Sequence, residues 1–312
     1  MPPQLNEQLA VALTDGNLEH LAGMPAADER DLLLTLLQIY ELALGPTDQM
    51  DGRARFEHHP VVNEMKWRFE QWLVDALDVR LGAAPTLGSD VAADVRRVAT
   101  QCNDSVYDWL AAAADWHQLV TFLAVEGGPD AGFDDLVALC QVGVHGPAKV
   151  VLGANYWDEM GCGEPSAVHT TLHDRFVAAL DLPAIPQSAQ PLSALFRAAL
   201  NGLLATNRWL QPEMLGALAL TELQAGPRCR RVLQAFRRLD APSEAYPFYE
   251  EHARTDPVHA KEWLEGALRP IVEQQPTWLP RIVRGTRWRA DVNNRLFRDL
   301  HTLLATREPL AV

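Results

Sequence analysis

The stretch YEEHARTDPVHAKEW, from Tyr249 to Trp263, decides the interpretation of the fold, because its pattern predicts a helix with a chemically special face. On a helix that turns by about 100° per residue, His252, Asp256 and His259 all point within about 60° of one another. The two histidine Cα atoms would lie about 10 Å apart, whereas those of a zinc-binding HExxH pair lie about 6 Å apart. The pattern therefore favours two metal ions over one. The alternative is an amphipathic helix whose histidines share a face by chance.

A second group of metal-binding residue types precedes this helix, in the stretch EMGCGEPSAVH from Glu159 to His169. On a continuous helix these two residues would lie about 15 Å apart, too far to share one ion. Gly161, Gly163 and Pro165 predict a break that folds the chain back and brings Glu159 and His169 together. The alternative is an ordinary corner between two helices, with a glutamate on the surface.

The HxxxDxxH pattern and the Glu-Gly-x-Gly-His pattern, in this order, resemble the motifs of the haem-oxygenase-like di-iron oxidase superfamily, also described as iron-containing redox enzymes. The resemblance covers about residues 105–270 and implies a haem-oxygenase-like helical bundle. It implies further carboxylate ligands from two other helices. On the first of these helices Glu126 is at the position of the family's carboxylate, with Asp130 as the alternative. On the second helix Glu222 is at that position.

The resemblance implies a site for two Fe(II) ions, with O2 as co-substrate. Its expected ligands are Glu126, Glu159, His169, Glu222, His252, Asp256 and His259. In this arrangement one iron is bound by His169, His252 and Glu159, and the other by His259, Asp256 and Glu126, while Glu222 bridges them or moves. Carboxylates combined with histidines suit iron or manganese better than thiolate-seeking zinc. Which carboxylate bridges stays open.

Composition limits the classes of partner. The formal net charge of −14 over 312 residues argues against nucleic acids and anionic membranes, because both require a basic surface. The four cysteines have no CxxC spacing, so we expect free thiols and a cytoplasmic protein. The N-terminal sequence lacks the pattern of a secretion signal, and no long apolar run predicts a membrane span.

Hydrophobic periodicity predicts an all-α protein, with no run of alternating residues that would indicate a strand. The predicted helices are 28–44, 60–81, 91–102, 105–127, 133–144, 146–160, 167–181, 191–208, 212–224, 227–238, 244–268 and 276–306. We expect the last to be interrupted near Gly285, and the helix 244–268 to bend at Pro257. The Gly- and Pro-containing stretch 82–90 is a candidate linker. It divides the chain into an accessory helical segment, 1–85, and a di-iron domain, 86–312.

Three further residues are candidates for the site on weaker grounds. His173 follows His169 by four residues, but we interpret it as a packed or surface histidine, because the ligand set is already complete. Arg281 and Arg284 are candidates for binding a substrate carboxylate, since guanidinium groups suit that geometry. The alternative for these arginines is a surface charge run.

The resemblance therefore implies an O2-dependent, non-haem di-iron oxidase that acts on a small amine- or carboxylate-bearing metabolite, and we expect it to belong to a biosynthetic pathway. The resemblance implies N-oxygenation, oxidative C–C cleavage or desaturation, and it does not choose among them. An external electron donor and a homodimer are compatible with it. One alternative is a non-catalytic helical interaction protein. Another is a haem-binding or haem-oxygenase-type protein, which needs one proximal histidine rather than a carboxylate-rich cluster.

Overall fold

The computed structural model describes residues 4–127 and 132–306, and every regular element in these ranges is a helix, which confirms the all-α prediction. The α-helices are α1 (Leu5–Asp15), α2 (Glu29–Leu44), α3 (Pro60–Leu81), α4 (Val91–Ala99), α5 (Ser105–Ala112), α6 (Trp116–Glu126), α7 (Phe133–Cys140), α8 (Gly146–Glu159), α9 (His169–Ala179), α10 (Leu192–Thr206), α11 (Gln211–Leu239), α12 (Tyr246–Glu262), α13 (Arg269–Gln274) and α14 (Leu279–Thr306). A π-helical segment, Trp263–Leu268, joins α12 to α13.

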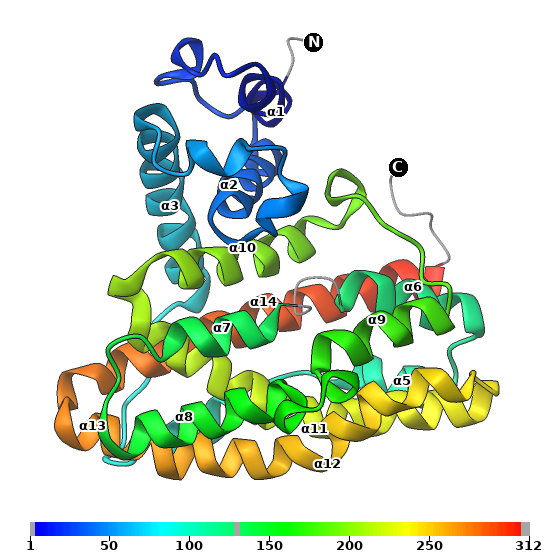
Figure 1. The fold of residues 1–312 in the computed structure, drawn as a ribbon. Helices are drawn as coiled ribbons and strands as arrows, with labels where there is room; N and C mark the ends of the chain where they lie inside the picture. Colours follow the sequence, from blue (N-terminus) through cyan, green and yellow to red (C-terminus); the bar gives the residue numbers. More distant parts are fainter. Residues whose placement is uncertain (1–3, 128–131, 307–312) are drawn as a thin grey trace.

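The helices lie in two groups, which can be followed in Figure 1. Helices α1, α2 and α3 stand on one side of α10, and the larger group lies on the other, with α8 and α12 on its outer side. Within the larger group α11 packs against both α12 and α14, while α10 packs against α2 and α14. One continuous core contains Leu36 of α2, Leu200 of α10 and Trp288 of α14, so the N-terminal helices share a core with the bundle. The division into domains at residue 85 stays a prediction.

Two predicted helix boundaries are wrong. The segment predicted as one helix over 105–127 is divided into α5 and α6, because Asp115 caps α6 by accepting a hydrogen bond from the Gln118 backbone N–H. Conversely, the two helices predicted over 212–238 are one continuous helix, α11, with Pro227 inside it. Pro227 has no backbone N–H, so α11 lacks one helical hydrogen bond there. The burial of α11 on several sides keeps the helix continuous.

The predicted interruption at Gly285 is also wrong, since α14 is continuous through this residue. Gly285 instead lies where α14 packs closely against α11. A Cβ atom at Gly285 would collide with the backbone carbonyl of Glu213 on α11, and one at Gly216 would collide with the carbonyl of Ile282 on α14. Glycines therefore face each other's helices where α11 and α14 cross, and they permit a contact between the two backbones.

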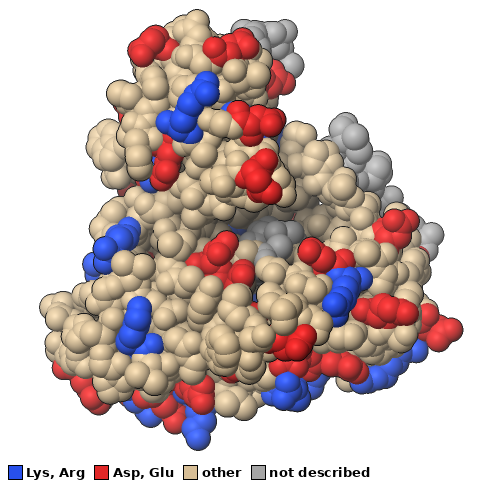
Figure 2. Space-filling model, in the orientation of Figure 1, with Lys and Arg blue, Asp and Glu red and all other residues tan. Residues whose placement is uncertain are grey.

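The surface and the cysteines agree with the composition. On the face shown in Figure 2, lysine and arginine side chains are scattered among acidic and uncharged ones. This face is hollowed between the N-terminal helices and the bundle. All four cysteines are free thiols, as predicted. Across the described ranges, we find no helix with the length and apolar character that a bilayer crossing requires.

The helix crossing gives a test of the fold. We expect Gly285→Ala to lower the free energy of unfolding by about 1–3 kcal/mol, because the added methyl group meets a backbone carbonyl that cannot rotate away. Gly153→Ala on α8 is the matched control, since its Cβ would make only an ordinary contact, 3.7 Å from Gln141 Oε1. The control should be neutral or stabilising by up to about 1 kcal/mol. Equal urea midpoints for the two variants would contradict the assigned crossing.

Candidate metal centre

The turn between α8 and α9 brings the first two expected ligands together. Glu159 is the last residue of α8 and His169 is the first residue of α9. Between them Gly161, Cys162 and Gly163 adopt positive φ angles, and a Cβ atom at Gly161 would collide with the backbone of Ala167. This compact turn reverses the chain, so that Glu159 Oε2 lies 2.5 Å from His169 Nδ1. The convergence predicted from the glycines and Pro165 is confirmed.

Helix α12 supplies three side chains from one face, as its spacing predicts. His252 Nδ1 lies 3.2 Å from Asp256 Oδ1, and Asp256 Oδ1 lies 3.9 Å from His259 Nδ1. The His252 ring lies against the His169 ring, with 4.6 Å between their centroids. Contacts between side chains thus link the α12 face to the pair formed by Glu159 and His169.

Helix α11 contributes Glu222. Its Oε2 atom lies 3.6 Å from His259 Nδ1, and both side chains are buried. Donor atoms of Glu159, Glu222 and His259 all lie within 4.8 Å of one another, a separation compatible with shared coordination of a metal ion. The approach of α11 to α12 is close here, because Gly226 leaves room for the Pro257 ring, 3.0 Å from where a Cβ would stand.

Six of the seven expected ligands therefore meet in the interior of the bundle. They come from α8, α9, α11 and α12: Glu159, His169, Glu222, His252, Asp256 and His259. We call these six residues the buried cluster.

The seventh expected ligand, Glu126, is engaged elsewhere. It lines the same cavity as the cluster, but its Oε1 atom accepts a hydrogen bond of 3.0 Å from the Tyr107 hydroxyl. Arg197 lies 3.4 Å from the same oxygen and also donates to the backbone carbonyl of Glu126. The alternative ligand, Asp130, lies outside the described residues.

Two carboxylates that the sequence did not single out lie beside the cluster. Asp134, in the first turn of α7, lines the cavity, and burial raises its pKa, as do the carboxylates of Asp135 and Glu159. An acidic residue in the first turn of a helix is common, so the pattern gave no reason to choose it. Asp158 is the other: its Oδ2 atom lies 3.0 Å from His259 Nε2. In the sequence only its position next to Glu159 could have pointed to Asp158, which lies on a more exposed side of α8.

The unpaired atoms of the cluster fit a metal site. Glu222 Oε1, Asp256 Oδ2 and His259 Nδ1 are buried and make no hydrogen bond to the described residues. Buried polar atoms without partners are costly, so such a concentration indicates a missing partner. The unpaired atoms are two carboxylate oxygens and one imidazole nitrogen, a donor set that suits iron or manganese.

Proton affinities show how strongly these groups interact. Burial raises the pKa of Glu222 to about 7, although His259 partly opposes the shift. Burial alone would lower the pKa of His252, but the Asp256 carboxylate outweighs it and raises the value to about 9. Burial likewise opposes protonation of His259, yet Glu222 and Asp158 raise its pKa to about 10. Without metal, the two imidazoles therefore hold protons that offset the carboxylate charges.

The cavity beside the cluster has a volume of about 130 Å³. Much of its wall is aromatic or aliphatic, including Phe176, Phe248 and Val232. His173 also lines it, with its ring against Phe176 and Phe248, and burial lowers its pKa. His173 lies next to the cluster, so the interpretation that it is only a packed histidine stays a prediction.

Arg281 and Arg284 lie away from this cavity. Arg281 donates to both carboxylate oxygens of Glu213, at 2.9 and 2.7 Å. Arg284 pairs with Asp78 and also lies 3.3 Å from Glu213. These contacts join α14 to α3 and α11, and neither arginine is among the residues that line the cavity.

A comparison with known protein families identifies the family of the chain. The family model for iron-containing redox enzymes matches residues 121–294, which is more than half of the chain. The chain belongs to this family. The matched range includes all six residues of the buried cluster, and the fold is the all-α, haem-oxygenase-like one that the resemblance implied. Family membership makes the protein an iron-dependent oxidoreductase. A search of curated proteins found no match to the chain.

The raised pKa values predict how the metal-free protein responds to pH. His252 and His259 bind protons more tightly when folded, with pKa values of about 9 and about 10, than when unfolded, near 6.5. Their contribution to stability is therefore complete below about pH 6.5 and is lost as pH rises through 9 and 10. Glu222 acts in the same direction around pH 7, because its protonated form is favoured in the fold. We expect the urea midpoint of metal-free protein to fall between pH 7 and 10.

Two variants separate this effect from general alkaline unfolding. His252→Gln should flatten the decline, because it removes one of the titrating groups. His117→Gln, at an exposed position on α6, should leave it unchanged. Identical pH profiles for wild type and His252→Gln would show that His252 does not carry a raised pKa.

Proposed function

We propose that the protein is an O2-dependent, non-haem di-iron oxidase that acts on a small amine- or carboxylate-bearing metabolite. N-oxygenation, oxidative C–C cleavage and desaturation are the reactions that the family resemblance suggests, and a biosynthetic pathway is the expected setting. The observation that carries the proposal is the meeting of six metal-binding side chains beside one cavity, five of them buried and three of them with an unpaired donor atom.

We assign Glu159, His169 and His252 to one iron, and Asp256 and His259 to the other. Glu222 lies close to Glu159, which we assign to one iron, and to His259, which we assign to the other. This position supports its assignment as the bridging or moving carboxylate. Asp134 replaces Glu126 in our assignment, because it lines the cavity near Glu159, whereas Glu126 is bonded to Tyr107 and Arg197. A single haem would leave this group of carboxylates without a role.

The residues around the proposed ligands have separate tasks. When bound, ferrous iron supplies the capacity to react with O2. Asp158 accepts the Nε2–H proton of His259, which leaves Nδ1 free to face Glu222. The apolar cavity wall excludes water from the reacting groups. We expect electrons to come from an external donor, and a homodimer is compatible with the proposal.

Iron loading tests the metal assignment. Anaerobic addition of Fe(II) should give about two irons per chain, since the donors are divided between two ions. Mixing with O2 should then produce a transient visible absorption. His252→Ala and Asp256→Ala should each reduce the iron content, whereas Glu250→Ala, at an exposed position on α12, should not. Wild-type iron content in both cluster variants would remove the assignment.

The contact between Asp158 and His259 gives a second test. In Asp158→Asn the amide can donate to His259 Nε2 and favour the tautomer with its proton on Nδ1, which cannot bind a metal. We expect Fe(II) affinity to fall by roughly 10- to 100-fold, measured by competition with a chelator. Asp174→Asn, at an exposed position on α9, is the control. Unchanged affinity in Asp158→Asn would mean that Asp158 does not orient the imidazole.

A further inference from the structure

A buried arginine lines the same cavity as the cluster. Arg228 lies on α11, six residues after Glu222, which corresponds to about 9 Å along the helix axis. Only 9% of its side chain is exposed. It is not part of the buried cluster, and the metal assignment gives it no role.

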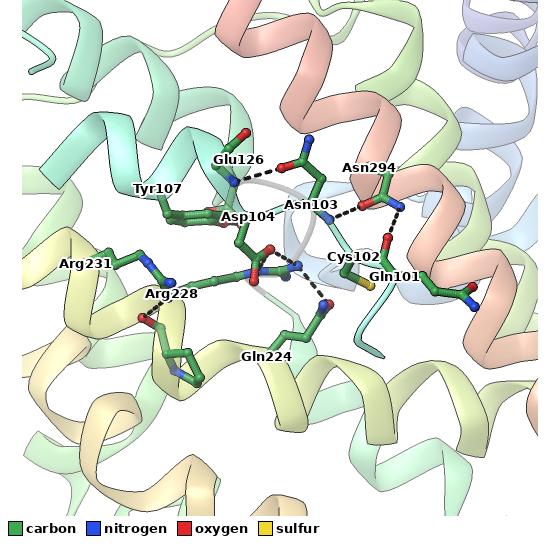
Figure 3. A network of polar contacts seen from close by, with 12 residues as sticks. Gln101, Cys102, Asn103, Asp104, Tyr107, Glu126, Gln224, Arg228, Arg231 and Asn294 are labelled. Carbon is green, nitrogen blue, oxygen red and sulfur yellow. Dashed lines mark hydrogen bonds and ion pairs between the residues drawn. The ribbon is translucent and has the colours of Figure 1, made fainter. Parts of the chain in front are cut away.

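Neighbouring side chains fix the guanidinium group in one orientation, as Figure 3 shows. Nε and Nη2 donate to Asp104 Oδ1 at 3.0 and 2.9 Å, and Nη2 also donates to Gln224 Oε1 at 2.8 Å. The Phe297 ring supports the group, with its centroid 4.7 Å from the guanidinium carbon. The contacts come from the chain before α5, from α11 and from α14, so the group cannot reorient without disturbing three segments.

These contacts use only part of the hydrogen-bonding capacity of Arg228. A guanidinium group has five N–H donors, and Nη1 carries two of them. Among the described residues none accepts a hydrogen bond from Nη1. Nη1 is not among the buried atoms that lack a partner, so it is accessible to a ligand, and a carboxylate oxygen matches a guanidinium well. A ligand in the cavity would supply such an acceptor.

The surroundings favour an anion over a cation at this place. An ammonium group would be repelled by the Arg228 guanidinium and could not accept its hydrogen bonds. The nearby carboxylate of Glu126 is already bonded to Tyr107 and Arg197, so it does not compete for Nη1. Apolar side chains, among them Phe176 and Phe248, complete the wall.

We propose that Arg228 binds the carboxylate of the substrate and holds its aliphatic part along the apolar wall, toward the buried cluster. The cavity of about 130 Å³ is similar in size to a cavity of about 150 Å³ that admits benzene, so the substrate is a small carboxylic acid. This inference rests on the proposed function for what happens to the bound acid. The binding itself requires no metal.

Three probes of equal chain length test the substrate class: hexanoate, hexanamide and hexylamine. Their affinities are measured by calorimetry with anaerobic iron-loaded protein and with metal-free protein. We expect hexanoate to bind at least about 10-fold more tightly than hexanamide in both forms, because a charged acceptor strengthens the hydrogen bonds. Hexylamine should bind most weakly. Hexylamine binding as tightly as hexanoate would overturn the proposal.

Variants assign the preference to one side chain. Arg228→Gln should weaken hexanoate binding by roughly 10- to 100-fold and leave hexanamide binding and iron content unchanged. Arg231→Gln is the control, because Arg231 pairs with Asp108 and does not line the cavity. If Arg228→Gln does not fold, the pair Asp104→Asn with Arg228→Gln removes both buried charges together. Hexanoate affinity equal to wild type in either variant would overturn the proposal.

The two proposals fail in different ways. Hexanoate selectivity that depends on Arg228, in a protein that binds no iron, would support the anchor and contradict the oxidase. Two irons per chain without selectivity for hexanoate would support the oxidase and contradict the anchor.

Discussion

The structure depends on how the bundle compensates the charges that it buries. Three carboxylates and two imidazoles of the cluster are buried, and the third imidazole, that of His252, is only 15% exposed. Ionised groups in such surroundings are stable only when paired. In the metal-free protein the imidazoles of His252 and His259 provide the compensation, by keeping protons that they would lose in water near neutral pH. Divalent cations can take over this role, because they attract the same carboxylates and displace the same protons.

The fold brings these groups together through two kinds of contact. The turn after α8 depends on positive φ angles at Gly161 and Gly163, and it sets Glu159 against His169. The packing of α11 on α12 depends on small residues at the contact, such as Gly226. Neither contact involves the chemistry of the cluster directly, yet both determine whether its donors can reach a common ion.

The sequence was most informative where spacing along one helix decides the geometry. The shared face of His252, Asp256 and His259 follows from the period of the helix alone. Contacts between helices follow no such rule. Asp134 and Asp158 could not be distinguished from ordinary surface carboxylates, and the contact of Glu126 with Arg197 could not be foreseen, because Arg197 lies on α10. The short helix α1 was missed entirely, and its burial against α2 shows that tertiary packing stabilises it.

In our proposals Arg228 and the cluster give the cavity two chemically different regions, one that binds an acid and one that binds metal ions. The central claim concerns the second region. Anomalous diffraction at the iron edge, from crystals loaded anaerobically with Fe(II), tests it most directly. The account predicts one iron peak beside Glu159, His169 and His252 and a second beside Asp256 and His259, with Glu222 near both. Iron bound elsewhere, or no peak at the cluster in a fully folded protein, would contradict it.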